Sequence, residues 1–191
     1  MSKKFHTISQ SSLPPEEDLA LADPLIVERT RFNHTRTHRY TLFRYWGNPE
    51  NYCVFIGMNP SGAGVLDSDR TINKCCKFAK RWGFDALYML NAFALRATDS
   101  NELYLSPDPV GPENDRWIRE IVIGARKVVV AWGVPGGDFH RGAQVKQILL
   151  SACGAEKVFC FGFNKDGTPI HPLYQPDDRA LECFFKATLT S

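Results

Sequence analysis

A run of six apolar or small residues, 52–57, ends in a glycine and passes directly into a loop rich in glycine and proline. An apolar run of this length, bounded by turn residues, is typical of a buried strand. In α/β sheets, ligands bind in the crevice outside the C-terminal ends of such strands. The loop opens with Met58, Asn59, Pro60 and Ser61, so we expect Asn59 to stand where a ligand is bound. A tight turn with a purely structural role is the alternative for this stretch.

Similar runs recur along the chain and alternate with helical patterns. Residues 86–93, 127–133 and 157–163 are apolar enough to be strands, and 142–153 has the apolar spacing of a helix. Helices are also expected after Asp69, a good N-cap residue, and at the C-terminus around 180–185. This alternation predicts an α/β fold of three layers, α/β/α, around a mostly parallel four-stranded sheet.

Length and composition are those of one ordinary globular domain. The chain has 191 residues, 43% apolar, and a net charge of +2. We expect a flexible arm at 1–23, a single domain at 24–191 and a monomer. Neither a signal peptide nor a membrane-spanning run is visible, and the six cysteines suit a reduced core, so a cytoplasmic location is expected.

A basic segment precedes the first apolar run. Between Arg29 and Arg44 there are five arginines, two histidines and no acidic residue. Its later part, 39–46, alternates as a strand does and is expected to pair antiparallel with the strand 52–57. Arg36 and Arg39 are candidates for contacts with a DNA backbone, as is Lys165 in a later turn. The alternative is a solvated edge strand whose charges prevent aggregation.

Polar side chains follow several of the expected strands. Asn59, Asn91, Trp132 and His171 each stand at or beyond the end of an apolar run. The C-terminal ends of parallel strands meet at one sheet edge, so these residues are expected to gather there. His171 is held between Ile170 and Pro172, and histidine titrates near neutral pH. Each residue also has a structural alternative, as a satisfied amide or a packed ring.

A long polar loop lies between the second expected strand and the helix that Pro112 is expected to start. Its polar residues include Arg96, Asn114 and Asp115. Loops of this length in a compact domain are often functional. Acidic residues at a helix start also suit the helix dipole, which alone would account for Asp115.

The order of these motifs resembles the uracil-DNA glycosylase superfamily. Its first motif, Gly-x-Asp/Asn-Pro after a core strand, corresponds to Gly57 to Pro60. An apolar strand ending in Asn corresponds to Asn91, a strand ending in Trp-Gly to Trp132 and Gly133, and a late His-Pro motif to His171 and Pro172. The resemblance covers roughly residues 50 to 175. It implies a uracil-DNA-glycosylase-like α/β fold with no cofactor and no metal.

The resemblance also implies roles for individual residues. Asn59 would position a water, Asp67 or Asp69 would contribute a carboxylate, and His171 would donate a hydrogen bond to the departing base. Asn91 would read the base edge, while Leu173 or Tyr174 would fill the gap in the DNA stack. The remaining substrate-binding candidates are Gly57, Met58, Pro60, Ser61, Arg96, Asn114 and Asp115.

A closer resemblance is to a bacterial and phage family of unknown function, carried by residues 57–61, 91–98 and 108–115. The chain departs from the glycosylase pattern at Leu173, where that superfamily usually has Ser, and in the loop 96–115. The polar residues of this loop predict a pocket for a larger, modified pyrimidine. Phage genomes contain such bases, so a role in antiviral defence would follow.

Two other classes of function remain open. The fold could bind a nucleotide or a modified nucleic acid without cleaving it, using 57–64 as a cradle. It could also hydrolyse free nucleosides or nucleotides. The loop is no Walker A motif because it lacks Gly-Lys-Ser/Thr, and the histidines and cysteines lack the spacing of a metal site.

Overall fold

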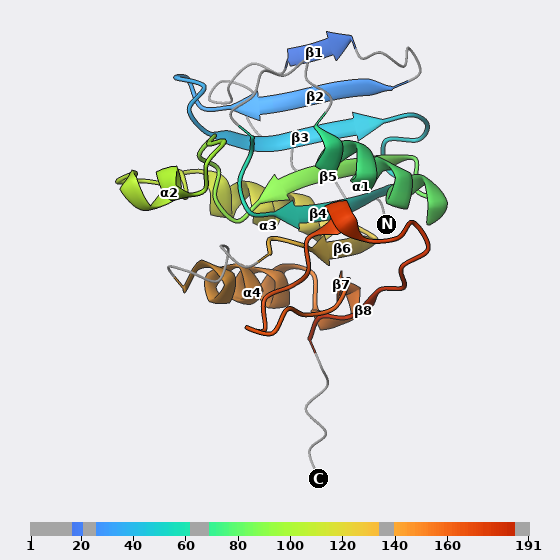
Figure 1. Cartoon of the computed structure of the whole chain (residues 1–191). Coiled ribbons are helices and arrows are strands. Elements are labelled where there is room, and N and C mark those ends of the chain that lie inside the picture. The colour runs from blue at the N-terminus through green and yellow to red at the C-terminus, as the bar shows by residue number, and fades with distance from the viewer. Residues whose placement is uncertain (1–16, 21–25, 62–68, 134–139, 186–191) are drawn as a thin grey trace, which may run out of the picture.

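The computed structural model describes residues 17–20, 26–61, 69–133 and 140–185. One mixed sheet of eight strands runs through this part of the chain in the order β1-β2-β3-β5-β4-β6-β7-β8 (Figure 1). The strands are β1 (Glu17–Ala20), β2 (Val27–Phe32), β3 (Arg39–Tyr45), β4 (Tyr52–Gly57), β5 (Ala86–Asn91), β6 (Lys127–Val130), β7 (Val158–Cys160) and β8 (Glu182–Cys183). The helices are α1 (Arg70–Arg81), α2 (Asn101–Leu105), α3 (Asn114–Gly124) and α4 (Arg141–Ala152), with short 3₁₀ turns at Ala155–Lys157 and Pro172–Tyr174.

Parallel pairing is confined to the middle of the sheet. β4 pairs in parallel with β5 and with β6, and β6 pairs in parallel with β7. The pairings β1–β2, β2–β3, β3–β5 and β7–β8 are antiparallel. The α/β class is therefore confirmed, but the sheet is larger and more strongly mixed than the sequence predicts.

The predicted partner of β3 is wrong. β3 pairs with β2 and β5, whereas β4 lies between β5 and β6. The crossover through α1 returns the chain as β5, which inserts between β3 and β4. β3 and β4 follow one another in the sequence but are therefore not neighbours in the sheet.

Helices cover both faces of the sheet, as Figure 1 shows for α1 on one side and α3 on the other. Side chains alternate across a strand. Val54 and Ile56 therefore pack into the cluster that includes Ile118 of α3 and Leu149 of α4. Cys53 and Phe55 pack into the opposite cluster with α1. The result is the expected three-layer arrangement, with the core on both sides of the central strands.

Local signals explain both ends of α1. The Asp69 carboxylate accepts hydrogen bonds from the backbone N–H groups of Thr71 and Ile72, which confirms it as the N-cap. After the helix, Gly83 adopts a φ of +80°, a left-handed conformation that glycine takes readily.

Two other predictions need correction. The expected C-terminal helix is absent from the described residues up to 185, where β8 pairs with β7 instead. Residues 17–20 of the expected flexible arm form β1, while most of that arm lies outside the described residues.

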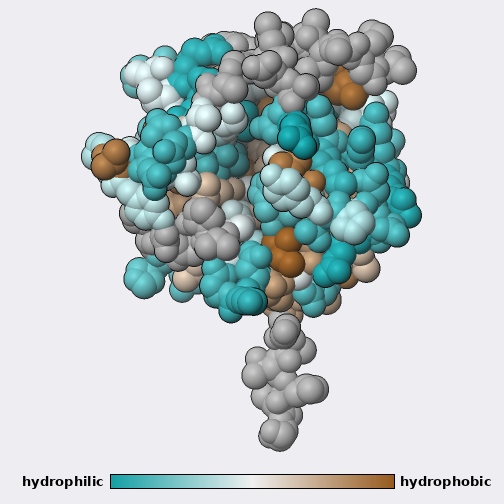
Figure 2. All heavy atoms as spheres, in the orientation of Figure 1, coloured by the Kyte–Doolittle hydropathy of each residue, from teal (hydrophilic) through white to brown (hydrophobic). Residues whose placement is uncertain are grey.

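Hydrophilic residues predominate on the face in Figure 2, where hydrophobic residues form small separate groups. Within the described residues, no helix combines the length and apolar character needed to cross a membrane.

Candidate active site

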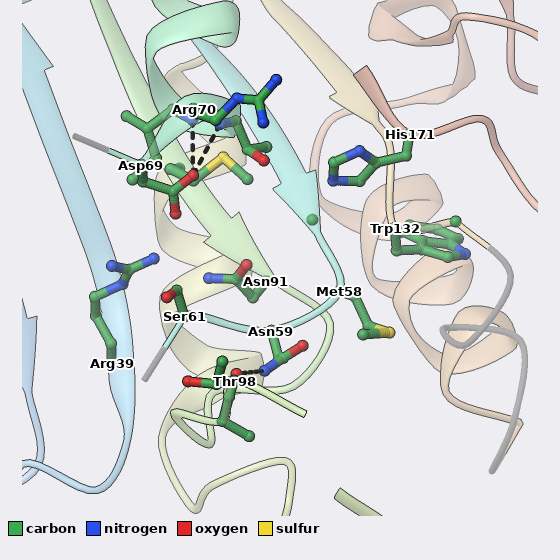
Figure 3. Close-up of a pocket in the computed structure, with 16 residues that line it drawn as sticks. Arg39, Met58, Asn59, Ser61, Asp69, Arg70, Asn91, Thr98, Trp132 and His171 are labelled. Carbon is green, nitrogen blue, oxygen red and sulfur yellow. Dashed lines mark hydrogen bonds between the residues drawn. The ribbon is translucent and has the colours of Figure 1, made fainter. Parts of the chain in front are cut away.

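A pocket of about 590 Å³ lies at the sheet edge where β4, β5 and β6 end (Figure 3). Gly57, Asn91 and Trp132 bring the ends of these three strands to it. The start of α1 and the segment leading to His171 complete its wall. The described residues that line it are Arg39, Gly57, Met58, Asn59, Ser61, Asp69, Arg70, Thr71, Ile72, Met89, Asn91, Ala97, Thr98, Trp132, Gly133 and His171.

The amide of Asn59 has a defined orientation. Its Nδ2 donates to the carbonyl oxygens of Pro60, at 3.1 Å, and Ala97, at 2.9 Å. Only the NH₂ end of an amide can donate to two carbonyls. Oδ1 is therefore the atom left to accept a hydrogen bond from a bound water or ligand.

Asn91 is the last residue of β5 and is 1% exposed. Its Nδ2 is buried and has no hydrogen-bond partner among the described residues. An unpaired buried donor costs roughly 1–3 kcal/mol, so its presence calls for an explanation. A ligand acceptor in the pocket would supply the missing partner.

Asn91 and Gly57 are paired in the parallel ladder of β4 and β5. A Cβ atom at Gly57 would come within 2.8 Å of Met89 Cε and 3.1 Å of Asn91 Oδ1. Glycine at this position therefore leaves the space in which the Asn91 amide lies.

His171 is half-buried, and burial lowers the pKa of its ring, while the nearby charge of Asp69 acts in the opposite direction. Its Nδ1 accepts a hydrogen bond from the backbone N–H of Leu173, at 3.3 Å. The neutral ring therefore carries its proton on Nε2. His171 can offer an uncharged N–H donor to a ligand at neutral pH.

Asp69 is the only carboxylate among the described residues that line the pocket. Its Oδ1 caps α1 through Thr71 and Ile72. Its charge also acts on both Arg39 and His171. Asp69 thus connects the two sides of the pocket electrostatically.

Arg39 reaches the pocket from the first position of β3. β3 runs antiparallel to β5, so the start of β3 lies beside the end of β5. There the backbone N–H of Arg39 donates to the carbonyl oxygen of Ala94 at 2.9 Å. Figure 3 shows its guanidinium group and the Asn91 amide directed toward the same part of the pocket. Burial lowers the pKa of Arg39 to about 10, so it remains a cation at neutral pH.

The structure brings many of the predicted site residues together. Among the residues assigned to chemistry or substrate, those in the pocket lining are Gly57, Met58, Asn59, Ser61, Asp69, Asn91 and His171. Arg39 also lines the pocket, although the sequence assigned it to a DNA backbone. Asp67 lies outside the described residues.

Other predicted residues have different positions. Pro60 does not line the pocket, and its carbonyl oxygen accepts a hydrogen bond from Asn59 Nδ2. Asn114 is buried and donates to the carbonyl oxygens of Asn91 and Ala92. Asp115 forms an ion pair with the buried Arg141. These three residues support the site without lining it.

The remaining candidates lie outside the pocket lining. Arg96 donates to the carbonyl oxygen of Arg36, at 3.1 Å, and both side chains lie over the ring of Phe32. Tyr174 is 80% exposed. Leu173 and Lys165 likewise do not line the pocket.

Sequence reasoning missed Arg70, Thr71 and Thr98 as lining residues. The start of a helix just after a Gly-rich loop could have indicated Arg70 and Thr71. Thr98 follows Ala97, whose carbonyl holds Asn59, and only the folded chain shows this contact. Among the described residues, no three His, Cys, Asp or Glu side chains are grouped as metal ligands would be.

Comparison with known proteins gives one match. A family model described as "Protein of unknown function (DUF1643)" matches residues 39–173. These limits enclose all the described residues that line the pocket, from Arg39 to His171. No curated protein and no solved structure matches the chain.

Proposed function

The chain belongs to the DUF1643 family, and we propose that it is a DNA glycosylase-like hydrolase that excises a modified pyrimidine base. One observation carries the proposal. Asn59, Asn91 and His171 come from three separate segments, and each presents a free polar group to the same pocket. The resemblance of their motifs to the uracil-DNA glycosylase superfamily, and the parallel strands β5, β4, β6 and β7, support it further.

The polar groups suit cleavage of an N-glycosidic bond. The Asn59 amide is held by two carbonyls, so Oδ1 accepts a hydrogen bond from a water and orients it toward the sugar carbon. The C–N bond breaks through an oxocarbenium-like state, and its electron pair leaves with the base. His171 Nε2–H then donates to the departing base, where negative charge develops.

The water adds to the sugar carbon and loses a proton. Asp69 is the carboxylate of the described lining residues, and we assign the acceptor role to it. An amide cannot accept this proton, so Asn59 acts only by positioning. Asn91 Nδ2 donates to the edge of the base, which requires the base to leave the DNA stack.

The pocket supports a substrate larger than an unmodified pyrimidine. Its volume of about 590 Å³ lies within the range of sites for drug-sized ligands. The loop 96–115 contributes only Ala97 and Thr98 to the lining. The volume of the pocket, rather than the polar residues of this loop, therefore favours a modified base. Excision of such bases from phage DNA would serve antiviral defence.

The test is a base-release assay on duplex and single-stranded DNA. The panel contains uracil, mismatched thymine, and hydroxymethylated, glycosylated and carboxylated pyrimidines. Wild type is compared with Asn59→Ala, His171→Ala and the control His140→Asn. His140 is exposed and outside the pocket, and asparagine tolerates its left-handed backbone.

Abasic sites from one substrate, retained in the control and lost in both pocket variants, would establish the glycosylase and identify its base. Release of unmodified bases alone would contradict the modified substrate. Absence of release from every substrate, with DNA binding retained, would make the protein a binding module. DNA binding should weaken steeply with salt, which separates this substrate from a free nucleoside.

A further inference from the structure

Within the described part of the chain, two buried N–H donors in the pocket have no acceptor. The Nε of Arg39 and the Nδ2 of Asn91 both lack a hydrogen-bond partner among the described residues. They belong to neighbouring strands, β3 and β5, and both residues line the same cavity. Native proteins rarely leave buried donors unpaired, and exceptions are frequent at functional sites. A ligand that supplies acceptors on this side of the pocket would satisfy both donors.

The charge of Arg39 narrows the choice of ligand. Within the described part of the chain, no carboxylate lies within ion-pair distance of its guanidinium group. Glu28, the nearest acidic residue along β2, pairs with Arg44 at 2.6 Å. Asp69 acts on Arg39 only at longer range and caps α1. Among the described residues, the half-buried positive charge of Arg39 therefore has no direct counter-charge, although it lies next to a cavity.

We propose that Arg39 and Asn91 bind an anionic oxygen group carried by the nucleotide unit that enters the pocket. This inference rests on the proposed function and names the chemistry of its substrate. The group is a carboxylate on the base or a phosphate of the nucleotide, since both offer charged oxygens. Arg39 sets specificity, and Asn91 donates to the same group or to the adjacent edge of the base.

Arginine is well suited to this role. Its planar guanidinium binds carboxylate and phosphate oxygens through two parallel N–H groups, which a lysine cannot do. A neutral acceptor would satisfy the hydrogen bonds but leave the charge uncompensated in a partly desolvated site. Arg70, exposed at the rim of the pocket, adds a second positive charge on the path of an entering anion.

The experiment measures binding, without cleavage, to the full chain at pH 7. The probes are uracil, 5-carboxyuracil, deoxyuridine, deoxyuridine 5′-phosphate and inorganic phosphate. The proteins are wild type, Arg39→Gln, Arg39→Lys and the control Arg126→Gln. Arg126 is exposed and precedes β6, so it lies at the opposite edge of the sheet from the pocket.

Wild type should bind an anionic probe about tenfold or more tightly than its neutral parent, since hydrogen bonds to charged groups are strong. Arg39→Gln should abolish this preference and leave the neutral probes unchanged. Arg39→Lys should keep only part of it, and Arg126→Gln all of it. A preference for 5-carboxyuracil assigns the anion to the base, and one for deoxyuridine 5′-phosphate assigns it to the nucleotide.

Absence of any anion preference in wild type would overturn the inference. An Arg39→Gln variant that loses neutral and anionic probes equally would do the same. The base-release assay stands apart from this result. An Arg39-dependent preference for anions without base release would refute the glycosylase and keep the anion site. Base release without that preference would support the glycosylase and refute the anion site.

Discussion

The Nδ2 group of Asn59 donates a hydrogen bond of 2.9 Å to the carbonyl oxygen of Ala97. A second bond from the same group reaches Pro60. Two backbone carbonyls therefore specify an amide at this position and disfavour a carboxylate. The water-positioning role proposed for Asn59 depends on this arrangement.

Asn59→Asp should destabilise the protein at neutral pH. The new carboxylate would face two carbonyl oxygens without a donor between them, with an expected loss of about 1–3 kcal/mol in the free energy of unfolding. Protonation would restore one donor, so the carboxyl pKa should be raised in the folded state and the deficit should shrink as pH falls from 7 to 4. Urea unfolding between pH 7 and pH 4 measures this loss of stability, with Asn59→Ala as the uncharged control. A variant as stable as wild type at pH 7 would contradict this account.

Asn91 and Asn114 offer a matched pair of buried amides. Asn91→Ala removes an unpaired donor, so it should change stability by less than about 1 kcal/mol while weakening ligand binding. Asn114→Ala removes the two bonds to the carbonyls of Asn91 and Ala92, and it should cost about 2 kcal/mol or more. Thermal unfolding and probe binding on both variants check the contrast. Equal loss of stability would show that Asn91 is structural.

His171 should make function sensitive to acid. Burial lowers the pKa of its ring, so the neutral form persists through neutral pH. Protonation of Nδ1 would break its bond from Leu173 N–H and remove the contact that fixes the tautomer and orientation of the ring. Base release should thus be constant above neutral pH and fall on acidification below it.

The lowered pKa of His171 also predicts how the free energy of unfolding depends on pH. The unfolded state takes up the His171 proton first as pH falls through about 6.5, so this residue lowers stability on the acid side and has no effect well above it. His171→Asn should remove this part of the pH dependence. Unfolding curves of wild type and variant should diverge below about pH 6.5; parallel curves would contradict the lowered pKa.

Arg39→Gln should stabilise the free protein. Burial lowers the pKa of Arg39 to about 10. The charged side chain therefore destabilises the folded state relative to the unfolded chain at every pH below that value. A neutral glutamine removes this destabilisation, for an expected gain on the order of 1 kcal/mol. Thermal unfolding without ligand measures it, with Arg126→Gln expected to be neutral. A large loss of stability would instead give Arg39 a structural role.

The buried strands and the helix start could be predicted because their signals are local. Apolar runs bounded by turns located β4 to β7, and an acidic residue before a helical pattern located the cap of α1. The gathering of Asn59, Asn91 and His171 followed from the rule for parallel strand ends.

Strand pairing between segments distant in sequence explains the wrong predictions of a C-terminal helix and of the partner of β3. Residues 180–185 have helical spacing, but the open edge of β7 takes Glu182 and Cys183 as a strand. The insertion of β5 between β3 and β4 likewise has no local signal. The place of Arg39 in the pocket lining was missed for the same reason, since the rule for strand ends does not cover the start of an antiparallel strand.

The exposed edge strand β8 gives the protein a ready point for chemical labelling. Cys183 is exposed, whereas the other five cysteines are buried. Burial raises the pKa of Cys53, Cys75, Cys76 and Cys153, and thiol reagents react with the thiolate. A maleimide dye should therefore attach to Cys183 in the native chain. The next residue, Phe184, contacts Trp132 with 5.8 Å between ring centroids, so the label would report on the segment that packs against the pocket wall.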